Sequence, residues 1–203
     1  MRTVPPMRKI SLVLGMLFAF FLSHAQEKSN LRIIDIFNME FISDPQISPD
    51  GSQILYVRNF KDIMTDRNLT NILAIKSDGS NNRPVTTGNQ NDSYPRWSND
   101  GKKIIFKSNR SDDRVKLFLM QMDTKETVAL TNGPNAPNNV SWSPDDTFLA
   151  FNMFVPKEQK SIIKLPPKPA GASWNKPPAY IDKLNYRGDG RGYLKNGNMQ
   201  LFT

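Results

Sequence analysis

A turn motif that returns about every 45 residues constrains the fold of this chain more than any other feature. Its copies are Ser48-Pro49-Asp50-Gly51, Ser98-Asn99-Asp100-Gly101 and Ser143-Pro144-Asp145-Asp146, whose serines lie 50 and 45 residues apart. A second marker keeps the same spacing, because Thr86-Thr87-Gly88 returns 45 residues later as Thr131-Asn132-Gly133. A period near 45 with several strands in each repeat is typical of β-propeller blades, which have about four strands each.

Each copy of the motif has the composition of a tight hairpin turn. Proline fixes φ at the second turn position, aspartate accepts hydrogen bonds from backbone amides, and glycine adopts the left-handed conformation. In the third copy Asp146 stands where glycine is expected, and aspartate reaches this conformation at some energetic cost. We therefore expect a hairpin turn at all three positions.

Apolar segments after the turns predict strands at 53–57, 103–106 and 147–151. In the second repeat, residues 116–122 place Leu117 and Leu119 on one face and Phe118, Met120 and Met122 on the other, as expected for a strand buried on both sides. A turn at 123–125 and a strand at 126–130 complete four strands. Trp97 and Trp142 occupy equivalent repeat positions, so we expect both to pack between blades.

The last residues, 199–203, look like the beginning of a third strand comparable to 117–122. We therefore expect the sequence to be a fragment of a longer protein. The fold class is all-β, a partial β-propeller of about three to four blades with four antiparallel strands each. The expected divisions are a signal peptide at 1–25, a lead-in at 26–44 and a propeller at 45–203, with blades near 45–90, 91–135 and 136–203 and a proline-rich insertion at 156–178.

Residues 1–25 have the three parts of an export signal in order. A basic start is followed by an apolar run of thirteen residues at 10–22 and by the small-x-small cleavage context Ser23-His24-Ala25. The apolar run is shorter than the roughly 20 residues of a membrane span, so we expect cleavage, an exported protein in the periplasm or medium, and no stable membrane anchor. Cleavage after Ala25 lowers the formal net charge from +8 to +5, with 24 basic residues against 19 acidic ones.

The expected mature chain lacks the residues of several kinds of reactive site. The sequence has no cysteine, and its single histidine is His24, so residues 26–203 cannot form a Ser-His-Asp triad. Gly171-Ala172-Ser173-Trp174-Asn175 lacks the second glycine of a nucleophile elbow. Imidazole and thiolate ligands for transition metals are absent as well. We expect no catalytic, cofactor-binding or metal-binding residues and no cofactor.

Other candidate residues have ordinary structural interpretations. A calcium site built from Asp112, Asp113, Asp145 and Asp146 is conceivable, but adjacent acids in turns are usually solvated, so no calcium site is assigned. Arg187-Gly188-Asp189 spells an adhesion tripeptide within a glycine-rich turn, and no adhesive role is assigned to it. Basic residues are scattered among acids without a basic run, so we expect no nucleic-acid partner.

The repeated turns and the lead-in from Asp35 through Gly51 resemble the amino-terminal propeller of prolyl oligopeptidase-family serine peptidases, in the branch like acylaminoacyl peptidases and dipeptidyl peptidases. TolB-like propellers carry similar Ser-Pro-Asp-Gly repeats. The later run from Tyr186 to Tyr193, which reads Tyr-Arg-Gly-Asp-Gly-Arg-Gly-Tyr, is more similar to the peptidase branch. Blades alone indicate architecture and not activity.

The resemblance implies a propeller that caps an α/β-hydrolase domain and restricts its active site to short peptides. No residue here matches the family's catalytic serine, aspartate and histidine, so we expect this chain to be inactive alone and to need the hydrolase domain as a partner. In dipeptidyl peptidases propeller acids bind the substrate amino terminus, but Glu40 and Glu158 lack a paired-acid context and are not assigned that role. The alternative is a non-catalytic TolB-like scaffold that binds envelope proteins.

Overall fold

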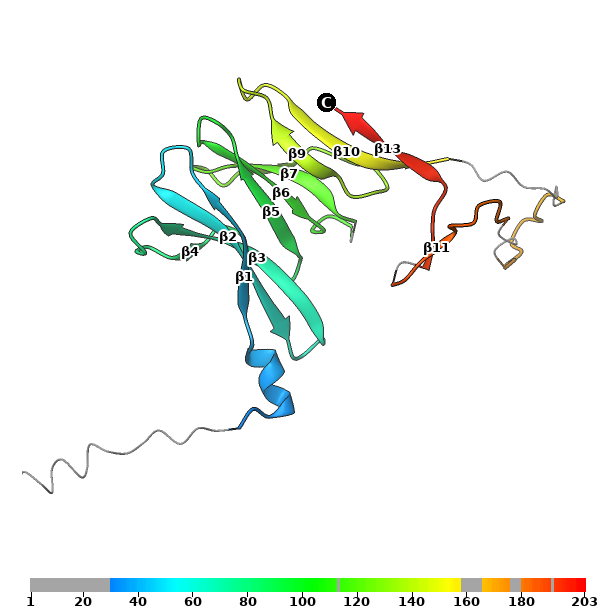
Figure 1. Cartoon of the computed structure of the whole chain (residues 1–203), viewed down its shortest axis with the longest axis horizontal. Coiled ribbons are helices and arrows are strands. Elements are labelled where there is room, and N and C mark those ends of the chain that lie inside the picture. The colour runs from blue at the N-terminus through cyan, green and yellow to red at the C-terminus, as the bar shows by residue number, and fades with distance from the viewer. Residues whose placement is uncertain (1–29, 113, 158–165, 176–179, 191) are drawn as a thin grey trace, which may run out of the picture. The chain divides into compact units, whose positions relative to one another are not determined.

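The computed structural model describes residues 30–112, 114–157, 166–175, 180–190 and 192–203. The predicted signal peptide, residues 1–25, lies outside the described residues. Every strand that the structure describes lies within residues 37–203, one of the two units into which the chain divides (Figure 1). A short 3-10 helix, η1 (Ile33–Asn38), precedes the strands. Within the described residues, no helix is long and apolar enough to cross a membrane.

Three antiparallel sheets follow one another along the chain. The first contains β1–β4 in sequence order and the second contains β5–β8 in sequence order, whereas the third has the order β13-β10-β9. The all-β, partial-propeller fold expected from the repeats is confirmed. The strands of the three sheets are β1 (Phe41–Ile47), β2 (Gln53–Asp62), β3 (Arg67–Lys76), β4 (Arg83–Pro84), β5 (Asp92–Trp97), β6 (Lys103–Ser108), β7 (Lys116–Gln121), β8 (Thr127–Ala129), β9 (Asn138–Trp142), β10 (Leu149–Pro156) and β13 (Gly197–Phe202).

All three predicted turns form, and their side chains make the same bonds. The serine hydroxyl donates to the aspartate two residues later at 2.6 Å in each case, from Ser48, Ser98 and Ser143. The same hydroxyl accepts a backbone N–H from the start of the following segment at 2.9–3.0 Å. Asp146 adopts φ 57°, close to the φ of 70° at Gly101, so the predicted left-handed aspartate is confirmed.

These hydrogen bonds lower the pKa of aspartates in the turns. The bond from Ser48, with further bonds from Ser52, lowers the pKa of Asp50 to about 2, and the bond from Ser143, with bonds from Thr147, lowers the pKa of Asp145 to about 2. A depressed carboxyl pKa contributes stability above the unfolded value, roughly 3.9, that is lost as the pH falls through the folded value near 2.

We expect Ser48→Ala and Ser143→Ala to raise the pKa of the neighbouring aspartate toward its ordinary value, because each removes the largest contribution to the shift. Side-chain carboxyl chemical shifts followed by NMR from pH 6 to about 1.5 measure this. Asp78 is the control within each variant, because its lowered pKa comes mainly from the hydrogen bond with Ser80, which neither substitution touches. Unchanged titration of Asp50 and Asp145 in the variants would contradict the assignment.

Two apolar clusters join the sheets. The first fills the space between sheets one and two, and Trp97 packs against it; its buried members are Leu55, Ile72, Ala74, Ile104, Phe106, Phe118 and Met120. The second joins Ile105 and Leu117 to Val140 of sheet three, with Trp142 packed against it. The predicted two-sided burial of the 116–122 strand and the packing of both tryptophans between sheets are therefore confirmed.

The first strands of sheets two and three connect each of these sheets to the one before it. Between sheets one and two, the backbone of β5 lies close to the backbones of β1, β2 and β3. The indole N–H of Trp97 donates to the Gln46 carbonyl at 3.3 Å, and that of Trp142 donates to the Arg96 carbonyl at 3.4 Å, so each first strand is bonded to the previous one. Side-by-side first strands with successive sheets packed face to face are the arrangement of propeller blades.

The third sheet confirms the predicted last strand and holds a long insertion. β13 pairs with β10 as β7 pairs with β6, with Phe151 opposite Phe202 as Phe106 is opposite Phe118. The predicted strand at 199–203 is thus the third strand of this sheet. The forty residues between β10 and β13 contain, in their described part, the small hairpin β11 (Arg187–Gly188) and β12 (Gly192–Tyr193).

Candidate functional site

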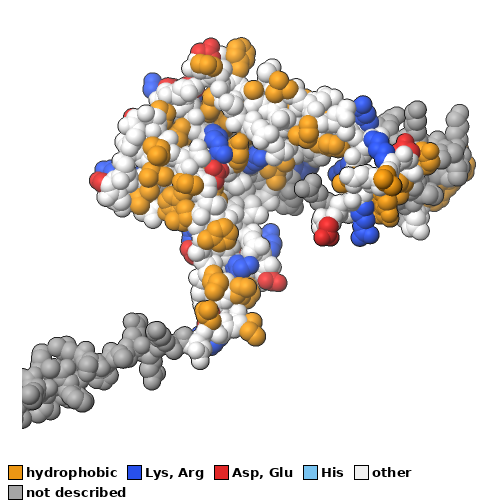
Figure 2. All heavy atoms as spheres, viewed as in Figure 1, with side chains coloured by type: hydrophobic (Ala, Val, Ile, Leu, Met, Phe, Trp, Pro, Cys, Tyr) orange, Lys and Arg blue, Asp and Glu red, His pale blue; other side chains and the backbone are white. Residues whose placement is uncertain are grey.

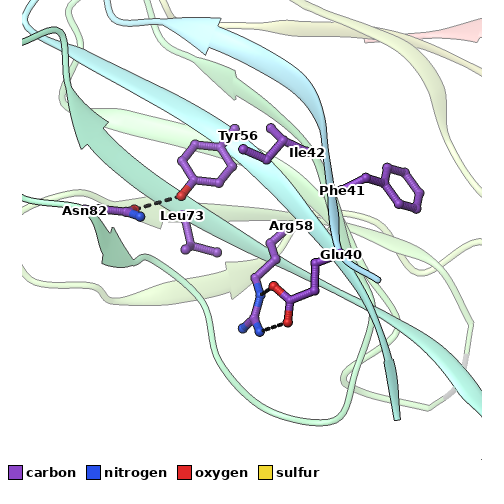
Figure 3. A pocket seen from close by; sticks show the side chains of 7 residues that line it. All are labelled: Glu40, Phe41, Ile42, Tyr56, Arg58, Leu73 and Asn82. Carbon is purple, nitrogen blue, oxygen red and sulfur yellow. Dashed lines mark hydrogen bonds and ion pairs between the residues drawn. The ribbon is translucent and has the colours of Figure 1, made fainter. Parts of the chain in front are cut away.

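A pocket of about 460 Å³ lies on the face of sheet one that is turned away from sheet two (Figure 3). Its placement follows from strand alternation: Leu55 and Ile72 point into the cluster shared with sheet two, so their neighbours Tyr56 and Leu73 point to the opposite face. The remaining lining residues are Glu40, Phe41, Ile42, Arg58 and Asn82.

The polar groups of this pocket are already paired with one another. Glu40 and Arg58 form a two-pronged ion pair, with Arg58 Nε donating to Glu40 Oε2 at 2.7 Å. The hydrogen bond from Arg58 lowers the pKa of Glu40. The hydroxyl of Tyr56 donates to Asn82 Oδ1 at 2.8 Å (Figure 3). The pocket therefore presents apolar side chains and paired polar groups, and both carboxylate oxygens of Glu40 already accept a bond from Arg58.

The equivalent positions in sheet two explain what this pocket is. Tyr56 and Leu73 correspond to Phe106 and Phe118, which lie 50 and 45 residues later, are buried, and stack at 5.8 Å beneath sheet one. The pocket is thus the place that a preceding sheet would fill. A second pocket, of about 410 Å³, lies on sheet three and is lined in part by Phe148 and Ala150.

A chain of polar contacts runs along the first strands of the three sheets. Arg96 Nη1 bonds both oxygens of Asp44 in the previous sheet, at 2.9 and 3.0 Å, and its guanidinium lies 3.6 Å from the ring centre of Tyr94. The ammonium of Lys107 lies 4.6 Å from the same ring and donates to Asn138 of the next sheet at 2.9 Å. Burial, followed by the charge of Arg96, lowers the pKa of Lys107.

We expect Arg96→Leu to lower the free energy of unfolding by about 1–2 kcal/mol, because it removes a partly buried ion pair and a close cation–π contact. Urea denaturation followed by tryptophan fluorescence measures the change. Arg114→Leu is the matched control, since its pair with Asp112 is more exposed, and we expect it to cost less than about 0.5 kcal/mol. Equal losses for the two variants would contradict a structural role for the Arg96 contacts.

The structure separates the acids considered for calcium. Asp145 is bonded to Ser143 and Thr147, whereas Asp146 accepts the backbone N–H groups of Asn99 and Asp100. Asp112 pairs with Arg114 and Lys116, and Asp113 lies outside the described residues. Among the described residues, no group of three or more metal-binding side chains comes together.

The other sequence candidates are also placed. Arg187 and Gly188 form β11, and Gly188 pairs with Gly192, so the adhesion-like tripeptide begins a hairpin strand. Glu158 lies outside the described residues. The expectation that the chain has no catalytic or cofactor-binding residues stays a prediction.

Sequence reasoning missed one buried ion pair. Asp92, with no exposed surface, accepts two bonds from Arg110 Nη2 at 2.9 and 3.0 Å. The guanidinium also lies 4.9 Å from the ring centre of Phe106. Ile42 and Pro137 stand at the equivalent positions in the other sheets, so periodicity could not reveal this pair.

Comparison with known proteins connects this sheet arrangement to peptidases. The chain is 29% identical over 167 residues to the uncharacterized peptidase YuxL of Bacillus subtilis, covering 82% of this chain and 25% of that protein. This chain resembles the propeller part of a prolyl oligopeptidase-family serine peptidase. A stretch of 68 residues is 34% identical to dipeptidyl-peptidase 5 of Porphyromonas gingivalis, covering 34% of this chain and 10% of that protein.

Solved structures show the same fold for most of the chain. Acylaminoacyl peptidase of Pyrococcus horikoshii superposes with a TM-score of 0.60 at 16% identity, covering 81% of this chain and 23% of that one. No family model matches the sequence. The chain spans a quarter or less of the length of these peptidase relatives. The expected likeness to a peptidase-type propeller part is confirmed.

Proposed function

We propose that this chain is the amino-terminal propeller part of an exported prolyl oligopeptidase-like serine peptidase, in which the completed propeller caps an α/β-hydrolase domain and admits only short peptides. The observation that carries the proposal is the match to the peptidase YuxL, which covers 82% of this chain but only 25% of that protein. Export rests on the signal-like sequence at residues 1–25.

The free sheet faces support a larger propeller. Leu201 of β13 corresponds to Leu117 of β7, yet Leu117 is completely buried against sheet three while Leu201 is 73% exposed. On the same strand pair, the side-chain oxygen of Asn152 is shielded from solvent and has no hydrogen-bond partner among the described residues. At the corresponding position, Lys107 bonds across to the next sheet. A further blade would cover this apolar surface and offer partners to such polar groups.

The chain itself supplies no group for peptide-bond hydrolysis by a serine triad, because residues 26–203 contain no histidine. We therefore expect the purified chain to leave acylaminoacyl and dipeptidyl chromogenic substrates intact. Hydrolysis that a serine-directed inhibitor blocks would contradict this expectation.

The test of the proposed function is the coding sequence beyond codon 203 and its full product. We expect further blades followed by a hydrolase domain with a G-x-S-x-G motif, and a full product that cleaves short chromogenic peptides but spares a folded protein. A stop codon at this point with no hydrolase nearby would favour the TolB-like scaffold instead. A full product that degrades folded protein as readily as short peptides would contradict the gating role.

A further inference from the structure

The insertion between β10 and β13 carries the positive charge of the expected mature chain. Residues 157–196 contain nine of the 24 basic residues that follow residue 25, but only three of the 19 acidic ones, a net charge of +6. The rest of the mature chain has 15 basic and 16 acidic residues, a net charge of −1. The sheets are therefore nearly neutral, and the insertion is the basic part of the molecule.

The described end of this insertion also exposes apolar side chains. We call residues 180–190 and 192–195 the basic hairpin. Tyr186 and Tyr193 stack across it with ring centres 6.1 Å apart. Leu184 is fully exposed and Tyr193 is 66% exposed. Figure 2 shows hydrophobic and basic side chains next to one another in this part of the molecule.

The basic side chains of the hairpin are free to meet an external anion. Lys183, Arg187 and Lys195 are exposed, and none of them forms an ion pair with another residue that the structure describes. Lys183 makes one long hydrogen bond, at 3.5 Å, to Asn196. Asp182 and Asp189 are the acids of the hairpin, so its described residues carry a net charge of +1, and the net charge of +6 belongs to the insertion as a whole.

We propose that the basic hairpin binds reversibly to the surface of an anionic lipid membrane. Lys and Arg near such a surface are attracted to acidic headgroups, while tyrosine and leucine side chains enter the boundary between headgroups and acyl chains. Both kinds of side chain are exposed here within one short hairpin. The binding adds no stable anchor, because a few interfacial residues give weak, reversible attachment.

The apolar component favours lipid over other anionic partners. A soluble polyanion or a nucleic-acid backbone would use the basic residues but would leave the fully exposed Leu184 in water. A second copy of this chain would offer sheets with a net charge of only −1, which provides little electrostatic attraction.

Hydrogen–deuterium exchange of the full chain tests the proposal, because it reports on the hairpin separately from residues 1–25. We expect phosphatidylglycerol vesicles, at about ten times the lipid concentration for half-saturation, to slow exchange in hairpin peptides about tenfold and to leave β6–β7 peptides unchanged. Phosphatidylcholine vesicles should give no protection, and 0.5 M salt should remove most of it.

Two pairs of variants separate the contribution of the basic side chains to membrane binding from that of Leu184. Charge reversal at Lys183, Arg187 and Lys195 to Glu should abolish the protection, whereas the same reversal at Arg67, Lys76 and Lys102 on the sheets should preserve it. Leu184→Asn should weaken binding several-fold, while Leu130→Asn should not. The proposal would be overturned if anionic vesicles gave no protection or if neutral vesicles protected the hairpin equally. It would also be overturned, in favour of a soluble polyanion, if heparin protected the hairpin and Leu184→Asn did not change that protection.

Discussion

Leu117→Ala should lower the free energy of unfolding by about 2–5 kcal/mol, whereas Leu201→Ala should cost less than about 0.5 kcal/mol. The two leucines occupy the same position in β7 and β13, since Leu117 pairs with Lys107 and Leu201 with Asn152, 45 residues later. They differ in their surroundings. Sheet three completely buries Leu117, while the corresponding face beside Leu201 is open.

Urea denaturation of both variants measures this difference with a matched chemical change. Equal losses of stability would contradict the assignment of the two strands to equivalent positions. In a longer product with further blades, we expect Leu201→Ala to become about as costly as Leu117→Ala, because the next sheet then covers the side chain. A Leu201 variant that stays neutral there would contradict the proposed continuation of the propeller.

Asp92→Ala should destabilise the chain by about 3 kcal/mol, because it leaves the Arg110 guanidinium without its carboxylate at the edge of the core. Arg110 is partly exposed, with 26% of its side chain accessible, and this keeps the expected loss at the lower end of the range for buried pairs. Glu40→Ala, which breaks a more exposed pair with Arg58, should cost less than about 1 kcal/mol.

The double variant Asp92→Ala with Arg110→Leu shows whether the loss of stability comes from the unpaired guanidinium or from the lost packing of the Asp92 side chain. If the unpaired guanidinium causes the loss, the double variant should recover part of the stability of Asp92→Ala. A double variant that loses the sum of the two single changes would show that the ion pair is not the cause. Thermal and urea unfolding of the three variants complete the cycle.

The repeating parts of this fold could be predicted because they depend on local chemistry. Serine, aspartate and a left-handed residue form the same turn wherever they occur in this order, so even Asp146 could be anticipated. The alternation of Leu117 and Phe118 revealed a strand with two buried faces. β2 is longer than predicted, since polar residues such as Arg58 end the apolar pattern although the backbone pairing with β3 continues to Asp62.

Other features depend on tertiary contacts and have no periodic signal. Asp44, Tyr94 and Asn139 occupy the same repeat position and all have positive φ, between 50° and 59°. Tyrosine does not indicate this conformation by itself. The register of β1 and β5 shifts next to Asp44 and Tyr94, so these residues form a bulge in the first strand of each sheet.

The pockets could not be inferred from the sequence either. Their walls are ordinary blade-packing residues, such as Tyr56 and Phe148, and they are open only where no neighbouring sheet is present among the described residues. The same side chains would be core residues in a longer propeller.

Cysteine cross-linking between turns tests whether the sheets pack as blades in chain order. The chain has no cysteine, so each introduced pair reports alone. Asn99 and Asp146, on neighbouring sheets, are bonded at 2.8 Å through the Asn99 backbone N–H. We expect Asn99→Cys with Asp146→Cys to be joined by a short bifunctional thiol reagent. We expect Asp78→Cys, in the β3–β4 turn of sheet one, to remain unlinked to Asp146→Cys in sheet three. Efficient linking of the second pair, or none of the first, would contradict this order of the sheets.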